Sequence, residues 1–318
     1  MNQPRIVIAS PHRYPDLARL WYRGVSHGLV PALERAGLEV EVVVFRDAHV
    51  DEFVPGWFPG AVLEAPGPGV RDFLEFYDAA LSFDADYLFL LDADLFFVDP
   101  GWPVSWLPRF DDPDVAAVSF LRRTQEPGVY ALLCRADHYR ALPRPAFAPA
   151  YEDLEDERNT VNRQPGDIAA RRLRERGRKI LYADPAEAEE RIADFHGTTV
   201  IRASREVFGH LIDGHGFDGL VSRKRYFAMG AYDNALLGCL YQAVFGEPFA
   251  PGPDGEPLGG SVTAGVVRHE LGQIQDAELK TALEDYFLRS DRAILRLATL
   301  EGIDLQLPPL RPDGWRRS

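Results

Sequence analysis

The hydrophobic and polar positions in the N-terminal third of the chain alternate between short apolar runs and stretches with helical spacing. The apolar runs predict strands at Arg5–Ser10, Glu39–Phe45, Ala61–Ala65 and Tyr87–Leu91. Residues 16–37 and 70–81 repeat apolar side chains at helical spacing and predict helices. This order of elements indicates a Rossmann-like half, whose strands join one sheet through right-handed crossovers.

The last of these strands runs into two carboxylates, in the sequence Tyr-Leu-Phe-Leu-Leu-Asp-Ala-Asp at 87–94. Its unbroken apolar run is typical of a strand buried on both faces, and ligands of open α/β sheets bind beyond such strand ends. Residues two apart in an extended chain point to the same side, so Asp92 and Asp94 can address one point. Because neighbouring carboxylates repel, the pair predicts a bound Mg²⁺ or Mn²⁺ and, through it, a diphosphate; the alternative is an acidic surface turn.

Two other segments lie where a nucleotide could bind. The loop predicted at 10–14, after the first strand, contains Ser10, His12 and Arg13, and it forms either a wall of a nucleotide pocket or an ordinary turn. Arg71 follows a Gly-rich turn and begins the next helix, where it meets a base or phosphate, or is simply solvated.

Together, the Gly-rich turn, the helix with Arg71 and the strand ending in Asp92-Ala93-Asp94 resemble the N-terminal half of glycosyltransferases of the A fold. The resemblance implies that Arg71 contacts the base of a nucleotide sugar and that the Asp-x-Asp pair holds a divalent cation on its diphosphate. We therefore expect donor contacts from the loop after the first strand and from this motif, at Ser10, Arg13, Arg71, Asp92 and Ala93.

The same family resemblance extends to a second set of residues further along the chain. A strand at 198–202, a glycine loop at 216–218 and an acidic helix start at Asp233 resemble the acceptor side of that fold. Asp233 would then be the base of an inverting reaction, or would position the acceptor in a retaining one; the alternative is a helix N-cap. Val266–His269 is predicted as a short strand, and the resemblance implies that His269 completes the metal site with Asp92 and Asp94.

An earlier set of residues resembles the same pattern. Asp167 opens a predicted helix, residues 177–182 follow as a strand, and His196 comes later. The glycine loop at 216–218 favours Asp233 and His269, but the sequence leaves both sets open.

Composition and charge narrow the class of protein. The 318 residues are 46% apolar and 26% charged, as in an ordinary soluble protein. The net charge of −14 argues against a nucleic-acid partner, which needs a positive surface. Cys134 and Cys239 form no metal-ligand spacing or disulfide framework. Without a recognisable signal segment or membrane-spanning run, we expect a cytoplasmic protein.

The predicted fold class is α/β, a Rossmann-like mixed sheet flanked by helices, as in the glycosyltransferase A fold, with a helical C-terminal extension. The expected catalytic domain covers 1–275, with a nucleotide-binding half at 1–110 and an acceptor half at 111–275. Residues 276–318 follow as a helix and tail, and the helix packs on the domain or on a second copy in a homo-oligomer.

The predicted activity is that of a metal-dependent hexosyl- or N-acetylhexosaminyl-transferase. It would use Mn²⁺ or Mg²⁺ and a nucleotide sugar, expected to be a uridine diphosphate sugar, with a saccharide, small molecule or protein as acceptor. The alternatives are a nucleotide-sugar-binding module without catalysis, a sugar nucleotidyltransferase of similar fold, and a phosphatase with an aspartyl nucleophile.

Overall fold

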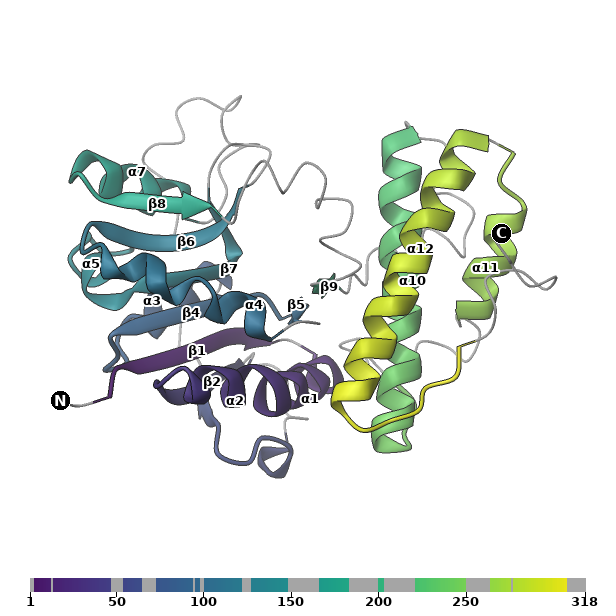
Figure 1. Cartoon of the computed structure of the whole chain (residues 1–318), viewed down its shortest axis with the longest axis horizontal. Coiled ribbons are helices and arrows are strands. Elements are labelled where there is room, and N and C mark those ends of the chain that lie inside the picture. Colours follow the sequence, from purple (N-terminus) through teal and green to yellow (C-terminus); the bar gives the residue numbers. More distant parts are fainter. Residues whose placement is uncertain are drawn as a thin grey trace. The chain divides into compact units, whose positions relative to one another are not determined.

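A computed structural model shows a chain that folds into two units. The structure describes residues 3–12, 14–46, 54–64, 73–93, 95–97, 100–121, 127–147, 166–182, 200–202, 221–249, 264–275 and 277–307. The sheet unit consists of residues 1–18, 29–93 and 100–188, and the helical unit of residues 19–28, 94–99 and 189–318. Figure 1 shows the elements of both units.

The sheet unit is built on a seven-stranded mixed sheet with the order β3-β2-β1-β4-β7-β6-β8. Its strands are β1 (Arg5–His12), β2 (Glu39–Arg46), β3 (Val62–Glu64), β4 (Tyr87–Leu91), β6 (Val115–Leu121), β7 (Pro127–Arg135) and β8 (Lys179–Tyr182). β7 pairs antiparallel with both β4 and β6, whereas the other pairs are parallel. All strands except β7 therefore have their carboxyl ends at one edge of the sheet.

Helices cover both faces of this sheet (Figure 1). One face packs against α3 (Phe73–Ala80), α5 (Ala136–Arg140) and α7 (Asp167–Glu175), which share a buried core with it. On the other face, β2 contacts α2 (Val30–Arg35), and the ring of Phe89 in β4 packs on Trp106, just after α4 (Gly101–Val104). Short 3₁₀ turns lie at Pro55–Trp57 and Leu107–Asp111.

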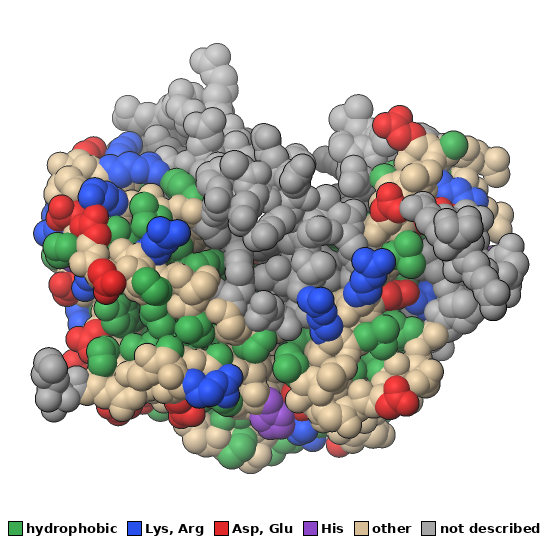
Figure 2. Space-filling view, viewed as in Figure 1, with side chains coloured by type: hydrophobic (Ala, Val, Ile, Leu, Met, Phe, Trp, Pro, Cys, Tyr) green, Lys and Arg blue, Asp and Glu red, His purple; other side chains and the backbone are tan. Residues whose placement is uncertain are grey.

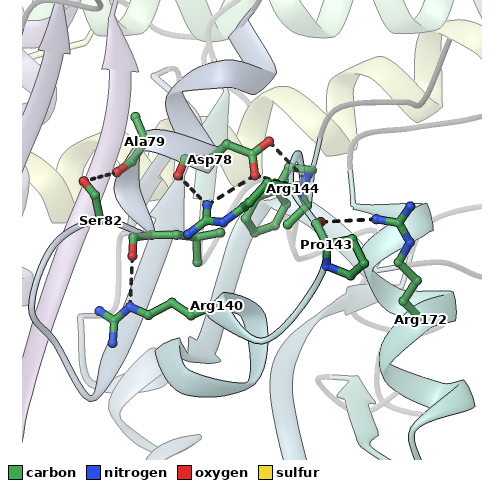
Figure 3. Close-up of polar contacts among 10 residues, drawn as sticks. Asp78, Ala79, Ser82, Arg140, Pro143, Arg144 and Arg172 are labelled. Carbon is green, nitrogen blue, oxygen red and sulfur yellow. Dashed lines mark hydrogen bonds and ion pairs between the residues drawn. The ribbon is translucent and has the colours of Figure 1, made fainter.

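The segment after α5 is fixed by polar contacts to α3, at the end of that helix that precedes β4 (Figure 3). The Asp78 carboxylate accepts backbone N–H groups from Ala146 (2.6 Å) and Phe147 (3.2 Å), and the Arg144 guanidinium lies 3.6 Å from it. Arg140 donates to the carbonyl oxygens of residues 81, 83 and 85, which lie between α3 and β4. The Arg140 bonds satisfy backbone carbonyls of the turn that joins α3 to β4.

The helical unit contains α10 (Val221–Phe245), α11 (Ala264–Gly272) and α12 (Ala277–Leu300), which contact one another, and a two-stranded pair of β5 (Leu95–Phe97) and β9 (Val200–Arg202). Helix α1 (Pro15–Gly24) begins in the sheet unit and ends in the helical unit, and a π-helical turn at Val25–Leu29 follows. In the helical unit, Arg19 of α1 donates to Glu247 (2.8 Å) and lies over the Phe245 ring.

The predicted fold class is confirmed: a mixed sheet is flanked by helices and the chain continues into the C-terminal helix α12. Three local predictions are wrong. Ser10 and His12 belong to β1 and not to a loop, because β2 pairs with β1 as far as His12. Residues 266–269 form part of helix α11 and not a strand, and Asp233 lies in the middle of α10 and not at a helix start. The functional boundaries at 110 and 275 stay predictions.

Candidate functional site

The candidate site lies at the carboxyl edge of the sheet, between β1 and β4. After β1 the chain moves outward to β2 and β3, and it returns to β4 on the other side of β1. This reversal of strand order is a topological switch point, where the connections leave in opposite directions and open a crevice. The described residues nearest that point are the last residues of β1 and the turn at Asp92 and Ala93.

Asp92 directly follows β4, whose residues 88–91 are fully buried. Its own carboxylate is partly buried, and Oδ1 accepts a hydrogen bond of 2.6 Å from the Tyr77 hydroxyl in α3. A buried strand therefore brings one carboxylate to the switch point, and a buried tyrosine fixes one of its oxygens.

Ser10 and His12 end β1 on the side of the sheet that faces away from Tyr77. Alternation along the strand sets them opposite Val7 and Ala9, which belong to the core under α3. Ser10 is completely buried, and its Oγ has no hydrogen-bond partner among the described residues. Burial lowers the pKa of His12 to about 3, so the imidazole is neutral at physiological pH and supplies no charge to a phosphate.

Several predicted site residues lie outside the described residues: Arg13, Arg71, Asp94 and His196. Their roles stay predictions. Among the residues that are described, no three His, Cys, Asp or Glu side chains form a group that could hold a metal ion. The carboxylate of Asp92 is nevertheless the hard oxygen ligand that Mg²⁺ and Mn²⁺ prefer, so its chemistry fits the predicted cation.

Asp167 begins α7, as the alternative reading of the sequence predicts, and Gly166 before it has φ 92°. Residues 176–178 then reverse the chain into β8, which runs parallel to β6. A helix that precedes a parallel strand begins at the carboxyl edge of the sheet. The backbone of Asp167 is thus at the same edge as Asp92, within the sheet unit.

Asp233 has a different setting, in the helical unit. It is 1% exposed, and its Oδ2 accepts a hydrogen bond from the Tyr286 hydroxyl of α12. Burial raises the pKa of Asp233 to about 7, with a further upward contribution from the negative charge of Asp291, while the Ser290 and Tyr286 hydroxyls oppose the rise. A carboxylate enclosed in this way ties α10 to α12.

A second polar cluster joins the same helices to α11. Arg268 Nη2 donates to both oxygens of Asp291, each at 3.0 Å, and the Tyr232 hydroxyl donates to Asp291 at 2.5 Å. The ring of Tyr232 stacks on Phe287 with 4.0 Å between centroids. Burial raises the pKa of Asp291, against the effects of Tyr232 and Arg268.

His269 is exposed on α11, next to the buried Arg268. His269 was predicted to end a strand, and it lies instead within a helix. The predicted metal site of Asp92, Asp94 and His269 is untested, because Asp94 lies outside the described residues. Sequence reasoning missed Tyr77, Tyr286 and Arg268, all of which belong to long-range contacts. Only the apolar spacing of the helices with Tyr77 and Tyr286 signalled that those two residues are buried.

The described surface has mixed charge. Figure 2 shows Lys and Arg side chains (blue) and Asp and Glu side chains (red) close together on the sheet unit. Arg178 pairs with Asp114 at 2.8 Å and Lys179 with Asp112 at 2.7 Å. These pairs break up the positive charge around α7 and β8, in keeping with the acidic composition. No helix in the described ranges is both long and apolar enough to cross a membrane.

Comparison with known proteins finds no matching family model and no matching curated protein. Among solved structures, the chain is similar to the mannosyltransferase PcManGT from Pyrobaculum calidifontis in complex with GDP-Man and Mn²⁺. The identity is 13% and the TM-score 0.47, over 96% of this chain and 89% of that chain.

Two further solved structures are similar over shorter stretches. The glycosyltransferase GlyE of Streptococcus pneumoniae TIGR4 has 11% identity and a TM-score of 0.39, over 68% of this chain and 51% of that one. A CMP:2-keto-3-deoxy-manno-octonic acid synthetase complexed with CTP has 16% identity and a TM-score of 0.36, over 59% and 96%. TM-scores this low carry no weight for the function of this chain, which has to be argued from its own residues.

Proposed function

We propose that this chain is a metal-dependent glycosyltransferase, which moves a sugar from a nucleotide diphosphate donor to an acceptor hydroxyl. The observation that carries the proposal is the Asp92 carboxylate, placed by the buried strand β4 at the switch point of a mixed α/β sheet. The donor is expected to be a uridine diphosphate sugar, with a hexosyl or N-acetylhexosaminyl group. Arg71 and Arg13 are expected to contact its base and phosphates.

Sugar transfer builds positive charge on the anomeric carbon while the diphosphate departs with negative charge. A Mn²⁺ or Mg²⁺ ion, when bound, neutralises that leaving group. Asp92 and Asp94 would hold the ion, and the apolar strand in front of them would fix their position. The assignment of His269 as a metal ligand, made from the sequence, stays a prediction.

The acceptor side needs a carboxylate that an acceptor hydroxyl can reach. We assign this role to Asp167 in preference to Asp233. Asp167 begins α7 at the carboxyl edge that also presents Asp92, whereas Asp233 is buried between α10 and α12 and bonded to Tyr286. Turnover should therefore fall in Asp167→Asn and persist in Asp233→Asn, as measured by release of nucleotide diphosphate from the donor sugar.

Calorimetric binding of uridine diphosphate and guanosine diphosphate, each with Mn²⁺ and again with a chelator, tests the donor site. Metal-dependent binding that prefers one base supports the proposal and identifies the base. The matched control for Asp92→Asn is Asp86→Asn, at the amino end of the same strand, where the carboxylate accepts the Arg5 N–H at 2.8 Å. Binding that the Asp92 change leaves intact contradicts the proposal, and binding without turnover indicates a module that lacks catalysis.

A further inference from the structure

Tyr77 lies in the buried core of the sheet unit and contacts Asp92 of the candidate site. Its side chain is 1% exposed, and its hydroxyl donates to Asp92 Oδ1 at 2.6 Å. A tyrosine has few rotatable bonds, so a ring held by its neighbours fixes the direction from which the hydroxyl approaches.

The ring of Tyr77 is held by aromatic neighbours. Its centroid lies 6.0 Å from that of Phe147, at an interplanar angle of 57°. Phe147 in turn stacks on Tyr139 of α5 at 5.3 Å and 14°. All three side chains belong to the buried core that covers this face of the sheet.

Phe147 is itself fixed by the residue that follows Tyr77 in α3. Asp78 accepts the backbone N–H groups of Ala146 and Phe147. It also pairs with Arg144, as Figure 3 shows. One turn of α3 therefore does two things: Asp78 secures the segment that packs on the Tyr77 ring, and Tyr77 directs its hydroxyl at Asp92. A continuous series of contacts therefore links Asp78, through Phe147 and Tyr77, to the Asp92 carboxylate.

We infer that Tyr77 is a positioning residue, which orients the Asp92 carboxylate for a divalent cation bound with a nucleotide diphosphate. This inference rests on the proposed function. A carboxylate has roughly four lone-pair positions, so one hydroxyl bond is compatible with a cation on the same group. Hydrogen bonds to ligating carboxylates orient them, and losing such a partner typically weakens metal affinity about 10- to 100-fold.

The test is the affinity for uridine or guanosine diphosphate as a function of Mn²⁺ concentration, in the full chain and in Tyr77→Phe. We expect roughly tenfold weaker binding at limiting Mn²⁺ in the variant. Saturating Mn²⁺ should restore the affinity, because the defect lies in orienting a metal ligand and not in the nucleotide contacts. General damage to the fold would weaken binding at every Mn²⁺ concentration, and that result overturns the inference.

Tyr139→Phe is the matched control, since it removes another buried hydroxyl from the same aromatic group. It should bind like the original chain. Phe147→Leu keeps the Tyr77 hydroxyl but loosens the ring, and it should weaken binding at limiting Mn²⁺ by less than Tyr77→Phe does. If Tyr77→Phe and Phe147→Leu both match the Tyr139→Phe control, Tyr77 has no positioning role.

Asp92→Asn separates failure of this inference from failure of the proposed function. If the original chain binds neither nucleotide with Mn²⁺, the proposed function falls and takes the inference with it. If the original chain binds, Asp92→Asn abolishes binding and Tyr77→Phe changes nothing, only the inference falls.

Discussion

Each unit contains an aspartate that accepts a hydrogen bond from a tyrosine, yet the two pairs occupy opposite environments. Asp92 follows a strand at the open edge of a sheet and is partly buried, with its oxygen fixed by Tyr77. Asp233 lies inside a helix, 1% exposed, with its oxygen fixed by Tyr286. The same chemical pair therefore serves a candidate binding site in one unit and the packing of helices in the other. The position of each pair in the fold decides which of these two roles it has.

The largest effect should come from the polar cluster of the helical unit. Replacing Arg268 by Met removes the guanidinium from Tyr232 and from the half-buried Asp291. Breaking a fully buried ion pair costs about 3–5 kcal/mol, and the partial exposure of Asp291 places this pair at the lower end of that range. Hydrogen exchange should then show faster opening of α10 and α12. β1 and β4 should keep their protection, since they belong to the other unit.

The double variant Arg268→Met, Asp291→Leu is the control for that prediction. It removes both charges and should recover much of the loss, because the damage comes from leaving the half-buried Asp291 carboxylate without its partner. An equal loss of protection in β4 would contradict the separation of the two units.

Unlike Arg268→Met, Asp92→Asn should have a large effect on nucleotide binding and little effect on the stability of the fold. Losing a hydrogen-bond partner of a metal ligand weakens metal affinity about 10- to 100-fold. Losing the ligand itself should therefore weaken Mn²⁺-dependent nucleotide binding by at least about 100-fold. The amide can still accept the Tyr77 hydrogen bond, so unfolding by urea should change little. A stability loss in Asp92→Asn as large as in Arg268→Met would mean that Asp92 is structural, like Asp233.

The strand that leads to Asp92 in the sheet unit could be predicted from the sequence, whereas the setting of Asp233 in the helical unit could not, for a physical reason. The strand ending at Asp92 is recognisable because an unbroken apolar run carries its own signal of burial, and the structure confirms its place in the sheet. Asp233 lies between Tyr232 and Asn234, and the long helix α10 continues through it. Its partner Tyr286 is 53 residues away, and no local pattern encodes such a contact.

The same reasoning explains why the residues of the candidate metal site could be placed only in part from the sequence. A motif fixes which residue types come together along the chain, and it located Asp92 correctly at a strand end. It does not fix the secondary structure of a distant partner, and His269 proved to lie on helix α11. The duplicate pattern at Asp167 could not be separated from Asp233 without knowing which aspartate begins a helix.

The pH dependence of stability should distinguish the two aspartates further. The pKa of Asp233 is raised to about 7 in the folded chain, above that of the same group when unfolded, so the folded state holds the proton more tightly. This stabilisation is complete below about pH 4, where the unfolded carboxyl is also protonated, and it is lost progressively as the pH rises to about 7. Between pH 5.5 and 7 the loss should be about 2 kcal/mol.

Asp233→Asn isolates that contribution, because the amide mimics the protonated carboxyl. Urea unfolding of the helical unit should then depend less on pH, with Asp291, whose pKa is also raised, contributing the remainder in the same direction. If the two pH profiles run parallel, Asp233 does not take up its proton in this range.

The smallest effect should come from Arg19 in the helical unit, which is half-buried and pairs with the exposed Glu247. Its guanidinium lies 3.9 Å from the Phe245 ring centroid, and it donates to Glu247 at 2.8 Å and to the Tyr241 hydroxyl at 3.2 Å. Glu247 is 55% exposed, so solvent screens that pair, and the cation–π contact contributes most. Arg19→Met keeps the apolar stem and should cost about 1 kcal/mol in urea unfolding. Glu247→Gln should lower the free energy of unfolding by less than Arg19→Met does. The reverse order would mean that the ion pair with Glu247 stabilises the fold more than the cation–π contact does.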